Sequence, residues 1–153
     1  MIRRTATVHL FYCANSVTEA ELQDLQTRLD ADGLRTLRLP CSGKATVPYL
    51  LKAFEKGADA VVLCACPESQ CKHLEGNLRA SKRAEAVDGV LDEIGFGKGR
   101  VVVVTKEQGQ SEKLIGAIQQ LQTELDEVYA VGAKPARGVL AGVRAGNRRE
   151  NAA

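Results

Sequence analysis

The sequence ADAVVLCACPESQC, at residues 58–71, decides the fold. Its first nine residues are almost all apolar, which is typical of a parallel strand buried on both faces of a sheet. The strand pattern runs into three cysteines, Cys64, Cys66 and Cys71, and a helical pattern follows them. The stretch therefore predicts a central strand of an α/β fold with a group of thiols at its end.

The same succession of a strand and a helix occurs four times along the chain. Strands are expected at residues 7–13, 34–41, 58–66 and 100–106, and helices at residues 18–33, 46–57, 76–95 and 111–128. Alternating strands and helices imply a parallel sheet with helices on both faces, connected by right-handed crossovers. We therefore expect an α/β fold with a single doubly wound four-stranded parallel sheet in the flavodoxin-like order 2-1-3-4.

Residues at the helix ends support this division of the chain. Thr18 and Glu21 have the spacing of a capping box, and Thr46 is the expected N-cap of the second helix. Gly33 and Gly57 are the expected C-terminal stops of these two helices. The third helix is expected to bury one apolar stripe, made of Val87, Val90, Leu91 and Ile94.

Composition and charge argue against several classes of protein. The 153 residues fit one domain, and 44% apolar with 26% charged residues are ordinary values for a soluble globular protein. A net charge of +2 and 4% aromatic residues argue against binding to nucleic acid or to an acidic membrane. No apolar run approaches the ~20 residues that span a bilayer, and the N-terminus lacks the pattern of a signal peptide. We therefore expect a cytoplasmic protein, in which disulfides are rare.

The chain divides into an α/β domain at residues 1–132 and a C-terminal tail at residues 133–153. The tail, AKPARGVLAGVRAGNRRENAA, carries five basic residues against one acidic residue. Such a composition does not support a packed core of its own. We expect the tail to dock on a partner protein, and the alternative is that it packs against its own domain.

The cysteines are expected to gather at one edge of the sheet. Cys13, Cys41 and Cys66 each end a predicted strand, and Cys71 lies in the loop that follows Cys66. The carboxyl ends of parallel strands meet at one edge, where open α/β sheets bind ligands, and neighbouring strands are ~4.8 Å apart. Four thiolates are the donor set of an iron–sulfur cluster or of a structural zinc ion. Two other readings stay open, namely buried cysteines that act as small apolar side chains and a thiol–disulfide switch.

Cys64 differs from the other cysteines in its place within the strand. It precedes Cys66 by two residues, so strand alternation points both side chains to the same face of the sheet, ~6.7 Å apart. Cys64 should therefore lie one pleat deeper than the strand end. We expect it to be a core residue, and it is the reserve ligand of the thiol site.

Three motifs together resemble those of a known family. They are LPCSGK at residues 39–44, AFEKGADAVVLCACPESQC at residues 53–71 and LEGNLRASKR at residues 74–83. Over residues 8–128, the chain resembles the delta subunit of methyl-viologen-reducing hydrogenase, also known as the hydrogenase iron–sulfur subunit. Similar subunits occur in heterodisulfide-reductase-like complexes and in complexes of the class II benzoyl-CoA reductase type.

The resemblance implies a [2Fe–2S] cluster and a role in electron transfer. Family members pass electrons between a flavin-containing heterodisulfide-reductase-like subunit and a partner oxidoreductase in an electron-bifurcating complex. Ser16 stands where the family usually has another cysteine, and Lys72 and His73 stand in place of its His-Tyr pair. Four cysteines match family cysteines by position and are the expected cluster ligands: Cys13, Cys41, Cys66 and Cys71.

The sequence therefore predicts an electron-transfer subunit that performs no bond-making chemistry of its own. If Ser16 replaces a ligand, either Cys64 substitutes for it or the cluster is lost. The first alternative function is a structural adaptor subunit with zinc or no metal at the thiols. The second alternative is a thiol–disulfide redox protein that uses Cys66 and Cys71.

Overall fold

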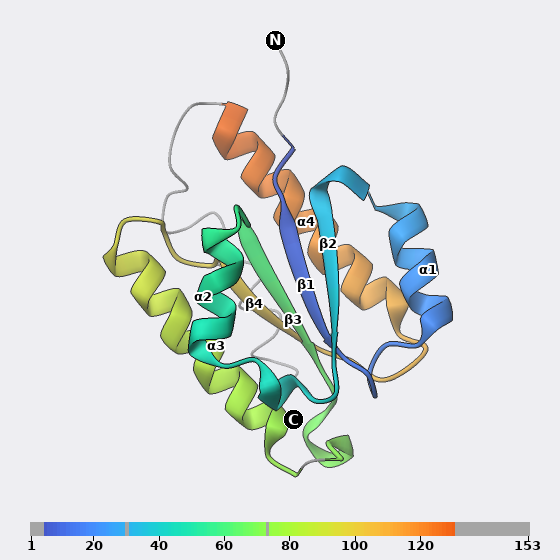
Figure 1. Cartoon of the computed structure of the whole chain (residues 1–153). Coiled ribbons are helices and arrows are strands. Elements are labelled where there is room, and N and C mark those ends of the chain that lie inside the picture. The colour runs from blue at the N-terminus through green and yellow to red at the C-terminus, as the bar shows by residue number, and fades with distance from the viewer. Residues whose placement is uncertain (1–4, 30, 73, 131–153) are drawn as a thin grey trace.

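The computed structural model describes residues 5–29, 31–72 and 74–130. Within these ranges a single parallel sheet is formed by β1 (Val8–Cys13), β2 (Leu34–Leu39), β3 (Ala60–Ala65) and β4 (Val101–Thr105). The strand order is β2-β1-β3-β4 (Figure 1). The predicted α/β fold and strand order are therefore confirmed. The predicted tail at residues 133–153 lies outside the described residues.

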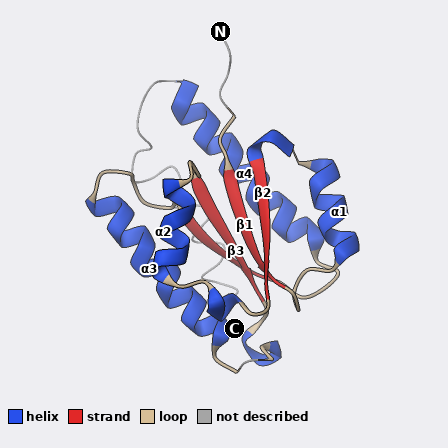
Figure 2. Cartoon of the chain, in the orientation of Figure 1, coloured by secondary structure: helices blue, strands red, loops and turns tan. Residues whose placement is uncertain are grey.

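Helices cover both faces of this sheet (Figure 2). One face is covered by α1 (Glu19–Arg28) and α4 (Ser111–Ala130), and the other by α2 (Val47–Glu55) and α3 (Gly76–Glu93). Three short 3₁₀-helices lie in the connections: η1 (Ala31–Gly33), η2 (Ser42–Lys44) and η3 (Glu68–Gln70). Among the helices of the described ranges, none has the length and apolar character needed to cross a membrane.

The inner strand β3 is covered by apolar side chains on both faces of the sheet, which explains its continuous apolar run. All of its residues are buried. Val62 and Cys64 belong to the core beneath α1 and α4, whereas Val61 and Leu63 belong to the core beneath α2 and α3. The two cores are therefore separated by the sheet and share its strands.

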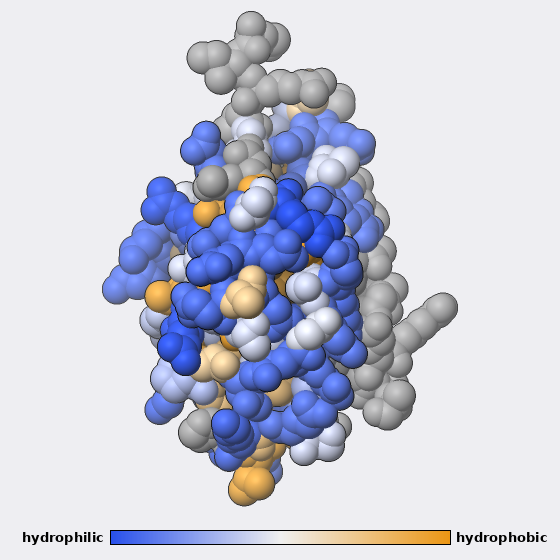
Figure 3. Space-filling model, turned by 90° about the vertical axis from the view of Figure 1, so that its right-hand side faces the viewer, coloured by the Kyte–Doolittle hydropathy of each residue, from blue (hydrophilic) through white to orange (hydrophobic). Residues whose placement is uncertain are grey.

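The edge strand β2 has a different character. Its residues Arg35 and Arg38 are exposed, and charged side chains on an edge strand oppose pairing with another chain. Figure 3 views the molecule from the side on which α1 and β2 lie in Figure 1, and this face is predominantly hydrophilic.

The first helix begins as predicted but ends earlier. The Thr18 side chain accepts a hydrogen bond from the Glu21 N–H at 3.2 Å, and the Glu21 carboxylate accepts one from the Thr18 N–H at 2.8 Å, which confirms the capping box. The predicted stop at Gly33 is wrong, because α1 ends at Arg28 and Leu29 is extended. Leu29 turns its side chain into the core, so burial of this residue ends the helix before the glycine.

The buried stripe of α3 also differs from the prediction. Val87 and Leu91 are buried as expected, but Val90 is 40% and Ile94 is 69% exposed. Ala80 and Ala84 complete the buried stripe instead. Residues spaced by three or four positions share a helix face, and the small alanines let this face pack closely on the sheet. The larger residues Val90 and Ile94 consequently lie outside it.

Candidate functional site

The four cysteines predicted as ligands lie at the carboxyl edge of the sheet in two close pairs. The first is called the strand pair. Cys13 is the last residue of β1 and Cys66 directly follows β3, and their sulfur atoms are 3.6 Å apart. Since β1 and β3 are hydrogen-bonded neighbours, the pairing of these two strands brings the thiols together.

The second pair, called the loop pair, consists of Cys41 and Cys71. Cys41 is the N-cap of η2, and Cys71 follows η3. The Cys71 thiol lies near the Cys41 thiol and contributes to raising its pKa. Both sulfurs lie against Gly76, the first residue of α3, since a Cβ added there would overlap the Cys41 sulfur and lie 3.4 Å from the Cys71 sulfur. The loops after β2 and β3 therefore meet at the start of α3.

The two pairs lie close enough to influence each other electrostatically. Burial raises the pKa of the Cys41 thiol, and the neighbouring Cys71 and Cys13 thiols raise it further. Burial and then the Cys13 thiol raise the pKa of Cys66 to about 12, with a smaller contribution from Cys71. Metal ligation requires thiolates, and a bound metal ion stabilises that form.

Cys64 lies apart from both pairs. It is fully buried in the core beneath α1 and α4, and its sulfur is 3.6 Å from the Ser16 hydroxyl. Burial raises the pKa of Cys64 to about 11. The structure thus places the Ser16 hydroxyl against the Cys64 thiol.

Two donors face the sulfur atoms of the site. The Gly43 N–H donates to the Cys41 sulfur at 3.4 Å. The Asn15 side-chain amide donates to the Cys66 sulfur at 3.9 Å and to the Gln70 carbonyl at 3.3 Å. Asn15 therefore connects the strand pair to the loop that carries Cys71.

Two side chains from α3 hold the loops of the site in place. The buried Asn77 amide donates to the Cys66 carbonyl at 3.1 Å. The Arg83 guanidinium donates to the carbonyls of Gly43 and, at 3.5 Å, Ala45. Neither positioning role is predicted from the sequence, although Asn77 belongs to the motif LEGNLRASKR. Arg83 sits in a basic run that reads as a solvated helix face, so no sequence signal marks it.

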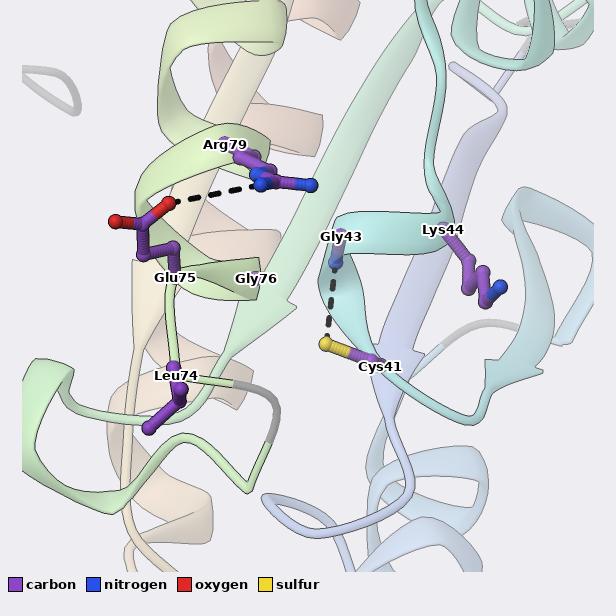
Figure 4. Close-up of a pocket in the computed structure, with 7 residues that line it drawn as sticks. All are labelled: Cys41, Gly43, Lys44, Leu74, Glu75, Gly76 and Arg79. Carbon is purple, nitrogen blue, oxygen red and sulfur yellow. Dashed lines mark hydrogen bonds and ion pairs between the residues drawn. The ribbon is translucent and has the colours of Figure 1, made fainter.

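A pocket opens beside the loop pair (Figure 4). The Cys41 sulfur points from η2 toward α3, and Glu75 and Arg79 form an ion pair at 3.6 Å at the start of α3. Leu74 is 82% exposed and has a left-handed backbone with φ of 58°, which is uncommon for a residue with a side chain. The lining residues are Cys41, Gly43, Lys44, Leu74, Glu75, Gly76 and Arg79. His73, which follows Lys72 in the sequence, lies outside the described residues.

The four predicted ligand cysteines are grouped as the strand pair and the loop pair. Among residues 5–29, 31–72 and 74–130, no three His, Cys, Asp or Glu side chains are placed to bind one metal ion together. The sulfurs of the loop pair fill the space beside Gly76 at the start of α3. Four thiolates are the donor set of a structural zinc ion and also of an iron–sulfur cluster.

Comparison with known proteins connects this arrangement to redox complexes. Residues 8–128 match the family described as methyl-viologen-reducing hydrogenase, delta subunit. The vhu iron–sulfur subunit of the F420-non-reducing hydrogenase of Methanocaldococcus jannaschii is 33% identical over 95 residues, which are 62% of this chain and 71% of that protein. The subunit of the same name from Methanococcus maripaludis is 32% identical over 102 residues, which are 67% of this chain and 74% of that protein.

A second kind of relative is much larger. One subunit of the ferredoxin/F420H2-dependent CoB-CoM heterodisulfide reductase of Methanosarcina acetivorans is 28% identical to this chain over 101 residues. These residues make up 66% of this chain but 13% of that protein. The same kind of sequence therefore occurs both as a small separate subunit and as a segment of a longer one.

Proposed function

Because the chain belongs to the family of methyl-viologen-reducing hydrogenase delta subunits, we propose that it relays electrons through a [2Fe–2S] cluster between redox subunits of a larger oxidoreductase. The observation that carries the proposal is the arrangement of four thiols in two pairs. In a [2Fe–2S] centre with four cysteine ligands, each of the two irons takes two thiolates. The strand pair would bind one iron and the loop pair the other.

The residues around the sulfurs would tune the relay. When bound, such a cluster takes up and releases one electron, and its reduced form carries more negative charge. Gly43 and Asn15 donate N–H groups toward the sulfurs of Cys41 and Cys66. Hydrogen bonds to ligand sulfur stabilise negative charge and raise the reduction potential. These donors, rather than a nucleophile or a general base, are the chemical contribution of the chain.

The loop pair is the proposed side of electron exchange with partners. Cys71 is half-buried, whereas the other three ligand cysteines are buried. The similarity to a segment of a heterodisulfide reductase subunit supports a place beside a flavin-containing subunit of that kind. We extend the proposal to an electron-bifurcating complex in the cytoplasm, where thiol ligands stay reduced.

The first test is the metal content of the anaerobically purified protein. Iron, zinc and acid-labile sulfide are measured on one sample together with the visible absorption spectrum. We expect about two irons and two sulfides per chain, with charge-transfer bands in the visible range. One zinc per chain, or no metal, would contradict the relay and would favour a structural adaptor.

A pair of cysteine variants tests the ligand assignment. Cys66→Ser should lose most of the iron, because Cys66 is one half of the strand pair. Cys64→Ser is the matched control from the same part of the chain and should keep the iron, because Cys64 lies in the core against Ser16. Unchanged iron and electron paramagnetic resonance (EPR) spectrum in Cys66→Ser would refute its role as a ligand.

One observation favours a second candidate, a thiol–disulfide couple. The sulfur that lies 3.6 Å from Cys66 belongs to Cys13, so the structure favours Cys13 over the predicted partner Cys71. Mass spectrometry after mild oxidation of the metal-free protein would detect a Cys13–Cys66 crosslink. A reversible crosslink in a protein that never carries iron would support this candidate over the relay.

A further inference from the structure

Gly76 occupies a position on which both thiols of the loop pair converge. It is the first residue of α3 and is buried. A Cβ at this position would overlap the Cys41 sulfur and lie 3.4 Å from the Cys71 sulfur. The space that a side chain would take at Gly76 is therefore used by the two sulfur atoms.

Neither the backbone nor the helix requires glycine at this place. Gly76 lies within the α-helix α3, whose conformation every L-amino acid adopts. Gly76 is not among the glycines with a positive φ, so its backbone conformation does not favour glycine over alanine. Space for the Cys41 sulfur is the remaining reason for a residue without a side chain.

The surroundings of Gly76 fix the turn that carries Cys41. A Cβ on Gly43 would lie 2.9 Å from the Cα of Gly76, so the backbones of η2 and α3 are packed directly against each other. Arg83, from the second turn of α3, donates to the carbonyl of Gly43. Because the turn is held by these contacts, a side chain at Gly76 would displace the sulfur by rotation of Cys41 before it displaced the backbone.

The start of α3 also favours negative charge at the loop pair. The side chain of Glu75, the N-cap residue, makes no capping hydrogen bond to the first turn. Backbone N–H groups at a helix start carry a partial positive charge that stabilises nearby anions. Thiolates at Cys41 and Cys71 would lie at this end of the helix.

We propose that Gly76 is a positioning residue, which places the sulfurs of Cys41 and Cys71 so that both reach the same iron. This inference rests on the proposed electron-relay function. It gives Gly76 a role in the geometry of the proposed iron site, separate from any role in the stability of the fold.

The test compares Gly76→Ala with Gly89→Ala. Gly89 lies in the same helix, and a Cβ there would have no atom within 4 Å, so it controls for the general effect of alanine in α3. We expect Gly76→Ala to fold, by circular dichroism, but to carry several-fold less iron, or to show a shifted EPR spectrum and reduction potential. Gly89→Ala should match the wild type in all three readouts.

The outcomes separate this inference from the function on which it rests. A wild type with iron and a Gly76→Ala variant with the same iron content, EPR spectrum and potential would overturn the inference and leave the relay intact. A wild type without iron would overturn both. If Gly76→Ala did not fold, the double variant Gly76→Ala/Cys41→Ala, which removes the overlapping sulfur, should fold. Failure of that variant as well would overturn the assignment.

Discussion

The two ends of the sheet each hold a buried polar cluster, and the clusters are built in opposite ways. At the amino end, Asp88 accepts hydrogen bonds from the N–H groups of Gly99, Arg100 and Val101 at 3.2, 2.9 and 3.3 Å. Asp59 accepts from the Thr7 N–H at 2.8 Å. The charges of this cluster are therefore used to satisfy the backbone where strands begin.

Side chains at the amino end also bind one another. The Tyr129 hydroxyl donates to Asp59 at 2.7 Å. The Arg100 guanidinium donates to the Asp59 carbonyl at 2.8 Å and lies 4.7 Å from the centre of the Phe96 ring. Hydrogen bonds between these buried groups stabilise the fold at the amino end of the sheet.

The carboxyl end of the sheet holds thiols that lie mainly against one another. Both pairs consist of thiols, and the proximity of these thiols raises the pKa of Cys41 and Cys66 beyond the effect of burial. Gly43 lets the backbones of η2 and α3 pack against each other, and Gly76 leaves space for the Cys41 sulfur. The comparison teaches that the polar groups at the amino end bind the backbone where strands begin, whereas the thiols at the carboxyl end lie against one another and raise one another's pKa.

The largest expected effect on stability comes from Asp88→Ala. It leaves three buried N–H groups at the start of β4 without their acceptor, so the free energy of unfolding should fall by about 3 kcal/mol. Urea denaturation of the metal-free protein measures this loss. Glu85→Ala, on an exposed residue of the same helix, is the control. If Asp88→Ala were as stable as the control, the polar cluster at the amino end would not be needed for the stability of the fold.

A smaller effect is expected from Tyr129→Phe. The variant loses the hydrogen bond to Asp59, which should cost about 1 kcal/mol. Burial raises the pKa of Tyr129 in the folded protein. The stabilisation should therefore be present below the unfolded pKa of about 10 and decline as the pH rises through the folded value.

The measurement for Tyr129 is chemical denaturation at several pH values. The difference in stability between wild type and Tyr129→Phe should narrow in alkaline solution. Tyr49→Phe, on an exposed tyrosine, is the control for replacing a tyrosine at the surface. If the difference in stability between wild type and Tyr129→Phe were the same at every pH, the hydroxyl of Tyr129 would not be the group that titrates.

The smallest effect on stability is expected from Cys71→Ser. Cys71 is half-buried, so the metal-free protein should lose less than about 0.5 kcal/mol, while iron binding should fall sharply. Cys64→Ser should show the reverse, with a loss of about 1 kcal/mol from a hydroxyl placed in the core and with normal iron content. Iron content and stability to urea are measured on the same preparations of both variants. If Cys71→Ser and Cys64→Ser lost the same amounts of iron and of stability, the distinction between a ligand cysteine and a core cysteine would be wrong.

Much of this organisation follows from the sequence because it depends on periodicity and topology. The apolar run of β3 and the alternation of strands and helices predict the sheet order. That order places Cys13, Cys41 and Cys66 at one edge. The end of α1 and the buried face of α3 were predicted wrongly, because burial of Leu29 and the small size of Ala80 depend on tertiary packing.

The pairing of the thiols could not be read from the spacing of the cysteines. Cys66 and Cys71 are near in sequence, yet the contact of Cys66 is with Cys13. The conformations of η2 and η3 decide which sulfurs meet, and those turns carry no periodic signal. The roles of Gly76 and Arg83 likewise arise only when α3 packs against the turn after β2. The role of Asn15 arises when the loop after β1 meets the loop after β3.

The strand pair joins residues that are 53 positions apart in the chain. The loop pair likewise joins the segments after β2 and β3. Neither pair can exist in a nascent chain before β3 has been made and has docked beside β1, because contacts between distant residues form late in folding. The thiol site is therefore completed only after the central strands are in place.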